Sequence, residues 1–203
     1  MSRNIDKIFY INLAYRTDRL SEIQTELSNM ELEAERYEGV HYPHNGPVGC
    51  GYSHINVLKL AKERKYKSIL IFEDDFTFLV SKQEFEKNLE LFFDSGIEYN
   101  VLMLSYNLQQ GTDVPEYPFL GKIVESLSTS GQIIHENYYD TLIELFEQAM
   151  PLLESTQEHW NYSIDTVTKH LQEKDKWYYL KTRIGKQRTS FSDNSQTTIE
   201  YNC

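Results

Sequence analysis

Three adjacent carboxylates, Glu73, Asp74 and Asp75, end the apolar run of the segment KSILIFEDDFTFL at residues 67–79. Crowded carboxylates repel one another and lose hydration, and a hard divalent cation that prefers oxygen ligands relieves both costs. In an extended strand end, Glu73 and Asp75 point to one side and Asp74 to the other. We therefore expect Mn²⁺ or Mg²⁺ to bind here, with Asp75 and Glu73 as metal ligands. The alternative is a solvated acidic turn that caps the next helix.

Alternating strands and helices must position these carboxylates, and the alternation predicts a single α/β domain with a central, mostly parallel sheet. The run 68–72 lacks polar alternation, as is typical of a parallel strand covered on both faces, and ligands bind at the carboxyl edge of such sheets. Expected strands are 7–13, 34–40, 68–72, 99–104, two within 122–135, and 176–183. Expected helices lie within 14–30, from about 53, and at 81–96, 137–155 and 161–174, and Pro151 is expected to disturb the helix at 137–155. Expected loops are 41–51 and 105–121. The domain is expected to span residues 1–183, before a polar tail at 184–203 that a ligand could order.

Composition excludes some classes of function. The net charge of -11 in 203 residues opposes nonspecific binding of nucleic acid, which requires a cationic face. No apolar run approaches the roughly 20 residues of a membrane-spanning helix, and the N-terminus lacks the pattern of a signal peptide. The two cysteines, Cys50 and Cys203, are too few for a disulfide framework, so we expect a reduced, cytoplasmic protein.

Two kinds of enzyme place acidic residues at the end of a buried strand. In a phosphotransferase of the haloacid dehalogenase type the strand ends in D-x-D-x-T, but here the nucleophile position is occupied by Glu73, whose extra methylene misplaces the attacking oxygen. In a metal-dependent glycosyltransferase the acidic residues hold a divalent ion on the diphosphate of a nucleotide sugar. The other segments of the chain favour the second interpretation.

Three motifs in order resemble glycosyltransferase family 25, the group of bacterial lipooligosaccharide and animal procollagen galactosyltransferases. They are FYINLAYRTDRL at 9–20, GCGYSH at 49–54 and ILIFEDDF at 69–76. The segments TSGQIIHENYYDTL at 129–142, SIDTVTKHL at 163–171 and QRTSFSDNS at 187–195 are also similar to parts of that family. The resemblance implies a GT-A fold, a Rossmann-like single domain, and inverting transfer of a hexose, galactose or glucose, from a UDP-sugar to a hydroxyl of a glycan or glycosylated acceptor.

Candidate residues for binding the donor follow the first strand and open the second helix. Amide and guanidinium groups after a first strand suit the oxygens of uracil, ribose or phosphate, and a serine that opens a helix can cap it. A basic run from Lys181 to Arg188 precedes the tail and could neutralise a diphosphate. The expected donor-binding residues are Asn12, Arg16, Arg19, Ser53, Glu73, Asp74, Gln187 and Arg188.

Asp165 and His54 are the candidate catalytic residues. An inverting displacement needs a general base opposite the leaving group, and the resemblance points to Asp165 for this role. His54 can donate a hydrogen bond to a hydroxyl or phosphate, and a structural histidine is the alternative. A non-catalytic module that binds a nucleotide sugar or a glycan is the rival function, and it would bind UDP with metal without releasing sugar.

Overall fold

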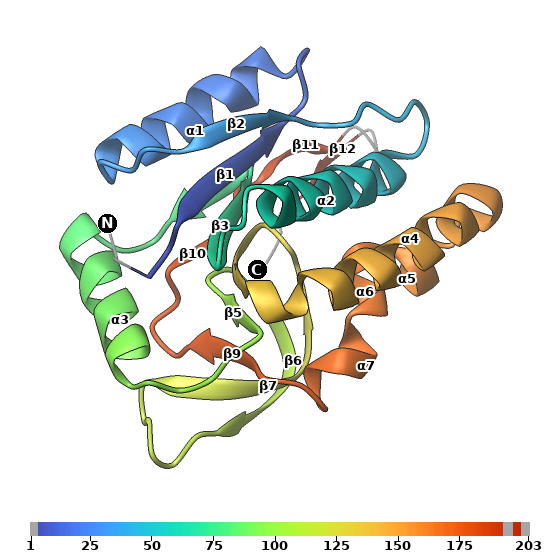
Figure 1. Cartoon of the computed structure of the whole chain (residues 1–203). Coiled ribbons are helices and arrows are strands. Elements are labelled where there is room, and N and C mark those ends of the chain that lie inside the picture. Colours follow the sequence, from blue (N-terminus) through green and yellow to red (C-terminus); the bar gives the residue numbers. More distant parts are fainter. Residues whose placement is uncertain (1–3, 193–196, 200–203) are drawn as a thin grey trace.

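An eight-stranded sheet forms the centre of the protein (Figure 1). The computed structural model describes residues 4–192 and 197–199, so Cys203 and parts of the predicted tail and of the QRTSFSDNS segment lie outside the described residues. The strands, in sheet order, are β2 (Glu35–Glu38), β1 (Lys7–Asn12), β3 (Ser68–Glu73), β8 (Gly131–His135), β5 (Val101–Met103), β9 (Trp177–Leu180), β7 (Leu120–Leu127) and β6 (Asn107–Asp113).

The predicted α/β class with strands mostly in one direction is confirmed, but neighbouring strands alternate more than expected. β2, β1, β3, β5, β9 and β6 run in one direction, whereas β8 and β7 run against them. β8 enters between β3 and β5 and is antiparallel to both, so only β1–β2, β1–β3 and β5–β9 are parallel pairs. The parallel strands β1 and β3 end side by side, where Ile11 is the partner of Glu73.

Helices cover both faces of the sheet because the central strands are apolar on both sides. Phe9 and Ile71 point into one core, which α2 and α4 complete, and Tyr10 and Phe72 point into the other, which α1 and α3 complete (Figure 1). The result is a three-layer arrangement with a core on each face of the sheet. The helices are α1 (Thr17–Asn29), α2 (Gly46–Glu63), α3 (Lys82–Asp94), α4 (Tyr139–Thr156), α5 (His159–Tyr162), α6 (Ile164–Val167) and α7 (Lys169–Gln172), with a 3₁₀ turn at Glu136–Tyr138.

The second helix begins earlier than the sequence predicts. Residues 46–51 were expected to be loop because of their glycines and proline, yet α2 already starts at Gly46, with Pro47 in its first turn, where proline is tolerated. The glycines are there for close packing. A Cβ on Gly49 would lie 2.3 Å from the carbonyl oxygen of Val40, and one on Gly51 would lie 2.0 Å from the sulfur of Met150 in α4.

Four further expectations were wrong. The polar segment 105–121 contains the edge strand β6, whose exposed side chains carry no apolar pattern. Pro151 does not interrupt α4, and residues 161–174 form parts of three short helices rather than one. The first residues of the predicted tail belong to the domain, because Ile184 is fully buried and β10 (Gly185–Gln187) pairs with β4 (Phe76–Phe78). A further pair is formed by β11 (Ser190–Ser192) and β12 (Thr197–Ile199).

Candidate active site

Phe76 anchors the turn that carries the carboxylates. β3 ends at Glu73, Asp74 and Asp75 form a turn, and the fully buried ring of Phe76 follows. Gly131 and Gly185 leave the space for this ring, since a Cβ on either would lie 2.4 or 2.1 Å from it. Because the ring and the pairing of β4 with β10 fix the chain after the turn, the carboxylates have little freedom to move away from the sheet edge.

On one flank of the turn, Asn12, Arg19, Asp74 and Asp75 form a buried group that we call the α1 side. The side-chain amide of Asn12 donates to Oδ2 of Asp74 at 2.8 Å, and Nη1 of Arg19 donates to Oδ1 of Asp74 at 3.0 Å. The same Nη1 lies 3.4 Å from Oδ2 of Asp75. Arg36 of β2 donates to the oxygen of the Asn12 amide at 2.9 Å, which fixes the orientation of that amide. Both oxygens of Asp74 are therefore engaged within the protein.

Asp75 is the carboxylate whose environment is least complete. Its Oδ2 receives long contacts from Arg19 and from the Gln187 amide, each at 3.4 Å, and within the described residues its buried Oδ1 has no hydrogen-bond partner. Burial, with the neighbouring charge of Glu73, raises the pKa of Asp75 to about 7. Burial also raises the pKa of Asp74, although Arg19 opposes this shift. A buried acceptor oxygen without a donor is what a bound cation would complete.

On the other flank, Cys50, His54, Glu73 and Thr129 form a group that we call the α2 side. Three groups converge on Oε1 of Glu73: Nε2 of His54 at 3.0 Å, the Thr129 hydroxyl at 2.6 Å and the Cys50 thiol at 3.8 Å. Burial alone would raise the pKa of Glu73, but the contacts with His54 and Thr129 bring it below its usual value. Of the two neighbouring acids, Glu73 therefore keeps its charge more readily than Asp75.

Asp165 approaches this site from α6. The backbone N–H of Ser128 points to its Oδ2 at 3.4 Å, and Ser128 has a left-handed backbone with φ of 86°. Such a conformation costs a non-glycine residue about 1 to 3 kcal/mol and is frequent at functional sites. After burial, the charges of Glu73, Asp165 and Asp75 are what raise the pKa of the Cys50 thiol. The fold thus brings Asp165 within electrostatic range of the same thiol as the acidic turn.

Among the predicted residues, the structure brings together Asn12, Arg19, His54, Glu73, Asp74, Asp75, Asp165 and Gln187. The side chains of the other three have partners outside the two groups described above. The guanidinium of Arg16 binds the exposed carboxylate of Asp18. Ser53 does not cap a helix, because α2 begins seven residues earlier; its buried hydroxyl bonds to backbone groups of Gly49 and Val40.

Arg188 is the third of these residues: its guanidinium forms ion pairs with Glu22 and Glu26 of α1, while its backbone N–H donates to the carbonyl oxygen of Asp75 at 2.6 Å. The expectation that Asp74 points away from Glu73 and Asp75 was wrong in part. Asp74 and Asp75 share Arg19, since they form a turn to which the alternation of a strand does not apply.

Two residues of the α2 side were not predicted to act at the site. Thr129 lies in the loop between β7 and β8, and of Cys50 we expected only that it is a reduced thiol. The helical spacing of Cys50 and His54, four residues apart, was the signal that could have joined the thiol to the imidazole. No local pattern connects Thr129 to Glu73, which is 56 positions away.

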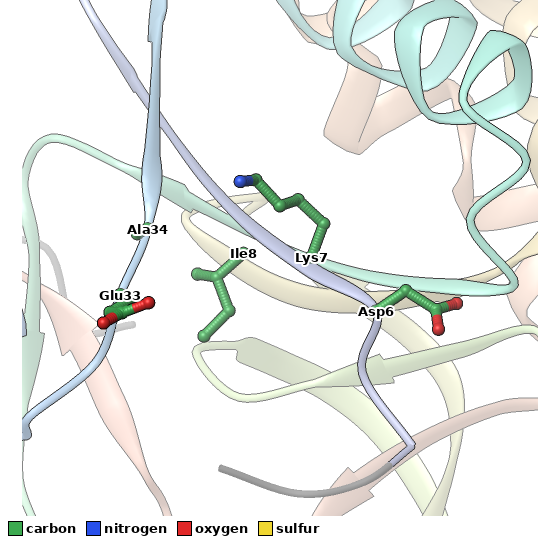
Figure 2. Close-up of a pocket in the computed structure, with 5 residues that line it drawn as sticks. All are labelled: Asp6, Lys7, Ile8, Glu33 and Ala34. Atoms are coloured by element: carbon green, nitrogen blue, oxygen red, sulfur yellow. The ribbon is translucent and has the colours of Figure 1, made fainter.

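A pocket of about 350 Å³ lies elsewhere, at the amino-terminal end of β1 (Figure 2). Asp6, Lys7, Ile8, Glu33 and Ala34 line it. Lys7 and Asn12 are at opposite ends of β1, which places the pocket roughly 16 Å of strand from the acidic turn. Two of its charged groups already have partners, since Lys7 pairs with Glu35, and Asp6 accepts bonds from backbone N–H groups of residues 67 and 68. The pocket is separate from the acidic turn, and none of the predicted site residues lines it.

Solved structures and a family model give three comparisons with known proteins. The fold is similar to that of a glycosyltransferase involved in the glycosylation of the major capsid of PBCV-1, with 11% identity, 94% of this chain and 95% of that chain covered, and a TM-score of 0.50. A197 from STIV aligns with a TM-score of 0.49 at 15% identity, over 97% of this chain and 94% of that chain. No curated protein matches by sequence.

The fold is that of a GT-A-like α/β protein. Support for a glycosyltransferase comes from the family model described next. The model of glycosyltransferase family 25 (LPS biosynthesis protein) matches residues 44–138, which confirms over that range the resemblance seen in the sequence. The match includes α2 and the acidic turn. Among the described residues, none of the helices has both the length and the apolarity needed to cross a membrane.

Proposed function

We propose that this protein is a metal-dependent, inverting glycosyltransferase that moves a hexose, galactose or glucose, from a UDP-sugar to a hydroxyl of a glycan or glycosylated acceptor. The observation that carries the proposal is the buried Oδ1 of Asp75, which has no hydrogen-bond partner in the described part of the chain and lies at the edge of the sheet where α/β proteins bind ligands. Oxygen donors suit Mn²⁺ or Mg²⁺, and Asp75 with Glu73 would hold the ion. Bound there, the ion would neutralise charge on the diphosphate leaving group.

The other residues of the site have supporting roles in this proposal. Asn12 and Arg19 hold Asp74 and limit the rotation of the turn. His54 and Thr129 bind Oε1 of Glu73, so that its second oxygen is the one that can face a ligand. Preorganised ligands of this kind lose little entropy on binding.

Asp165 is the proposed general base. The acceptor oxygen forms a bond to the anomeric carbon, the bond from that carbon to the diphosphate oxygen breaks, and the hydroxyl proton passes to the carboxylate of Asp165. The N–H of Ser128 restrains Oδ2 of this carboxylate. The displacement on the face opposite the leaving group inverts the anomeric carbon, and a base within about 3 Å of the attacking oxygen is what it requires.

The test is a panel of UDP-sugars assayed for UDP release with Mn²⁺ or with chelator, alongside thermal melting with UDP. A ligand present at about 100 times its Kd raises the free energy of unfolding by roughly 2.7 kcal/mol, so UDP should raise the Tm with Mn²⁺ and much less with chelator. Binding of UDP with metal but no release of sugar from any donor would identify a binding module instead of an enzyme. Equal Tm shifts with and without chelator would contradict the metal site.

A further inference from the structure

A thiol, an imidazole and a carboxylate converge on the α2 side. Nε2 of His54 lies 3.0 Å from Oε1 of Glu73, and Sγ of Cys50 lies 3.8 Å from the same oxygen. Each pair of these ligand atoms lies within 4.8 Å. We propose that Cys50, His54 and Glu73 form a site for a thiophilic divalent cation, Zn²⁺ above all, which shares Glu73 with the proposed Mn²⁺ position at Asp75.

The distances fit a tetrahedral ion. With Zn–N and Zn–O bonds near 2.0 Å and a Zn–S bond near 2.3 Å, tetrahedral angles separate N from O by roughly 3.3 Å and S from O by roughly 3.5 Å. The observed separations of 3.0 and 3.8 Å differ from these by about 0.3 Å each. Small side-chain rotations can close such differences, and water or a substrate oxygen would supply the fourth ligand.

Rigid elements carry all three ligands. Cys50 and His54 lie one turn apart on the long helix α2, so they face the same direction, and Glu73 is the last residue of the central strand β3. His54 is fully buried and Cys50 is partly exposed, which gives an ion a path to the site through the thiol. The combination of sulfur and imidazole ligands favours Zn²⁺ over Mn²⁺ or Mg²⁺.

The site lacks one feature of a permanent zinc centre. Histidine ligands usually donate their second ring N–H to a neighbouring acceptor, and within the described residues Nδ1 of His54 has no partner. We therefore expect reversible binding of Zn²⁺ rather than a structural ion that the fold requires. Under the proposed function, the consequence is regulatory: Zn²⁺ on Glu73 would compete with the donor and its Mn²⁺, and so inhibit transfer.

Cobalt reports on such a site without any activity. The full chain, freed of metal and reduced, would be titrated with Co²⁺, whose bond to a thiolate gives a charge-transfer band in the near ultraviolet. We expect this band in the wild type and expect Zn²⁺ to remove it. Cys50→Ser should lose the band, whereas Cys203→Ser, which changes the only other cysteine of the chain, should keep it.

Direct titration with Zn²⁺ gives the second readout. Loss of a residue that hydrogen-bonds to a metal ligand lowers metal affinity roughly 10- to 100-fold. Loss of the thiolate ligand itself in Cys50→Ser should therefore lower the affinity for Zn²⁺ by at least that factor. Melting of the metal-free variants should coincide with that of the wild type, because serine has nearly the shape of cysteine. If Cys50→Ser melts at a lower temperature than the wild type, Glu73→Gln takes its place. This variant keeps the shape of the carboxylate and should weaken Zn²⁺ binding while the thiol remains.

Three results would overturn the site: no cobalt band in the wild type, a band that survives in Cys50→Ser, or equal Zn²⁺ affinity in both. Inhibition of transfer by Zn²⁺ is a separate test. Zn²⁺ should inhibit Mn²⁺-supported transfer in the wild type at least 10-fold more strongly than in Cys50→Ser, in proportion to affinity. If no donor is ever turned over, the proposed function fails while the cobalt spectrum still decides the zinc site.

Discussion

The two sides of the acidic turn differ in how they treat neighbouring carboxylates. On the α2 side, three groups converge on a single oxygen of Glu73, and its pKa falls. On the α1 side, the side chain of Asp75 receives two long contacts from the described residues, and its pKa rises to about 7 because burial and the charge of Glu73 outweigh the attraction of Arg19. Short hydrogen bonds thus decide which of two buried acids keeps its charge. Glu73 is therefore held in place by hydrogen bonds, whereas Asp75 keeps an oxygen for which a cation would be the partner.

The largest effect is expected from Asp75→Asn. The amide keeps the shape of the side chain but removes the charge that would bind the metal, and metal stabilisation of several kcal/mol corresponds to a loss of transfer of roughly 1000-fold. UDP release with Mn²⁺ measures it. Asp140→Asn is the matched control, because Asp140 is an exposed carboxylate paired with Lys62 on the helical surface. Retention of more than about a tenth of the activity by Asp75→Asn would exclude Asp75 as the metal ligand.

Asp165→Asn should have the next largest effect. Loss of a general base typically lowers the rate by about 100-fold or more, and the variant should still bind UDP with Mn²⁺ because Asp165 makes no contact with the turn in the described structure. Transfer to an acceptor and the Tm shift with UDP and Mn²⁺ separate the two effects. Wild-type turnover would mean that the base lies elsewhere, and loss of UDP binding would assign Asp165 to the donor site.

The sequence predicted the α1 side better than the α2 side, for a physical reason. Asn12 and the acidic residues follow apolar runs whose patterns are local, and the helix expected at 81–96 is confirmed as α3, whose N-cap Ser81 accepts a hydrogen bond from the N–H of Glu84. The α2 side depends on packing between distant segments. Gly51 makes room for Met150, so a glycine that reads as a turn is instead a residue of a packed helix.

Two further features could not be read from local patterns. β6 is an edge strand with mostly exposed polar residues, and only its pairing with β7 makes it a strand. The orientation of Asp74 depends on the turn that Phe76 imposes by filling the space left by two glycines. In both cases the deciding contacts join residues far apart in the sequence, which no periodicity records.

The third prediction concerns stability without metal. Because the pKa of Asp75 is about 7 in the folded protein and about 3.9 when unfolded, the folded state binds more protons between these values, so stability falls as the pH rises through this range. The full shift corresponds to at most roughly 4 kcal/mol. An asparagine at position 75 avoids the free-energy cost of ionising a buried carboxyl, but it also loses the attraction to Arg19. Asp75→Asn should therefore be more stable than wild type by roughly half that amount near pH 8.

Urea unfolding with chelator at about pH 8 and about pH 5 measures this difference in free energy of unfolding. The advantage of the variant should shrink at the lower pH, where Asp75 is protonated in the folded wild type. An Asp75→Asn protein that is less stable than wild type at both values would mean that the carboxylate is well solvated, contrary to its burial.

The smallest effect is expected from Thr129→Val, which removes one donor to Glu73 without changing the shape of the side chain. A hydrogen bond to a charged acceptor contributes about 1.5 to 3 kcal/mol, and we expect the lower end of this range because His54 still contacts the same oxygen.

The contribution of Glu73 to stability should depend on pH with the opposite sign to that of Asp75. The pKa of Glu73 is lowered by folding, so its contribution is present above the unfolded pKa and disappears as the pH falls through the folded value. The loss in Thr129→Val should therefore be full near pH 7 and smaller near pH 4, with Thr112→Val on the exposed strand β6 as the control. A loss that is the same at both values would mean that the Thr129 hydroxyl acts through packing, and the contrast between the two sides would then rest on His54 alone.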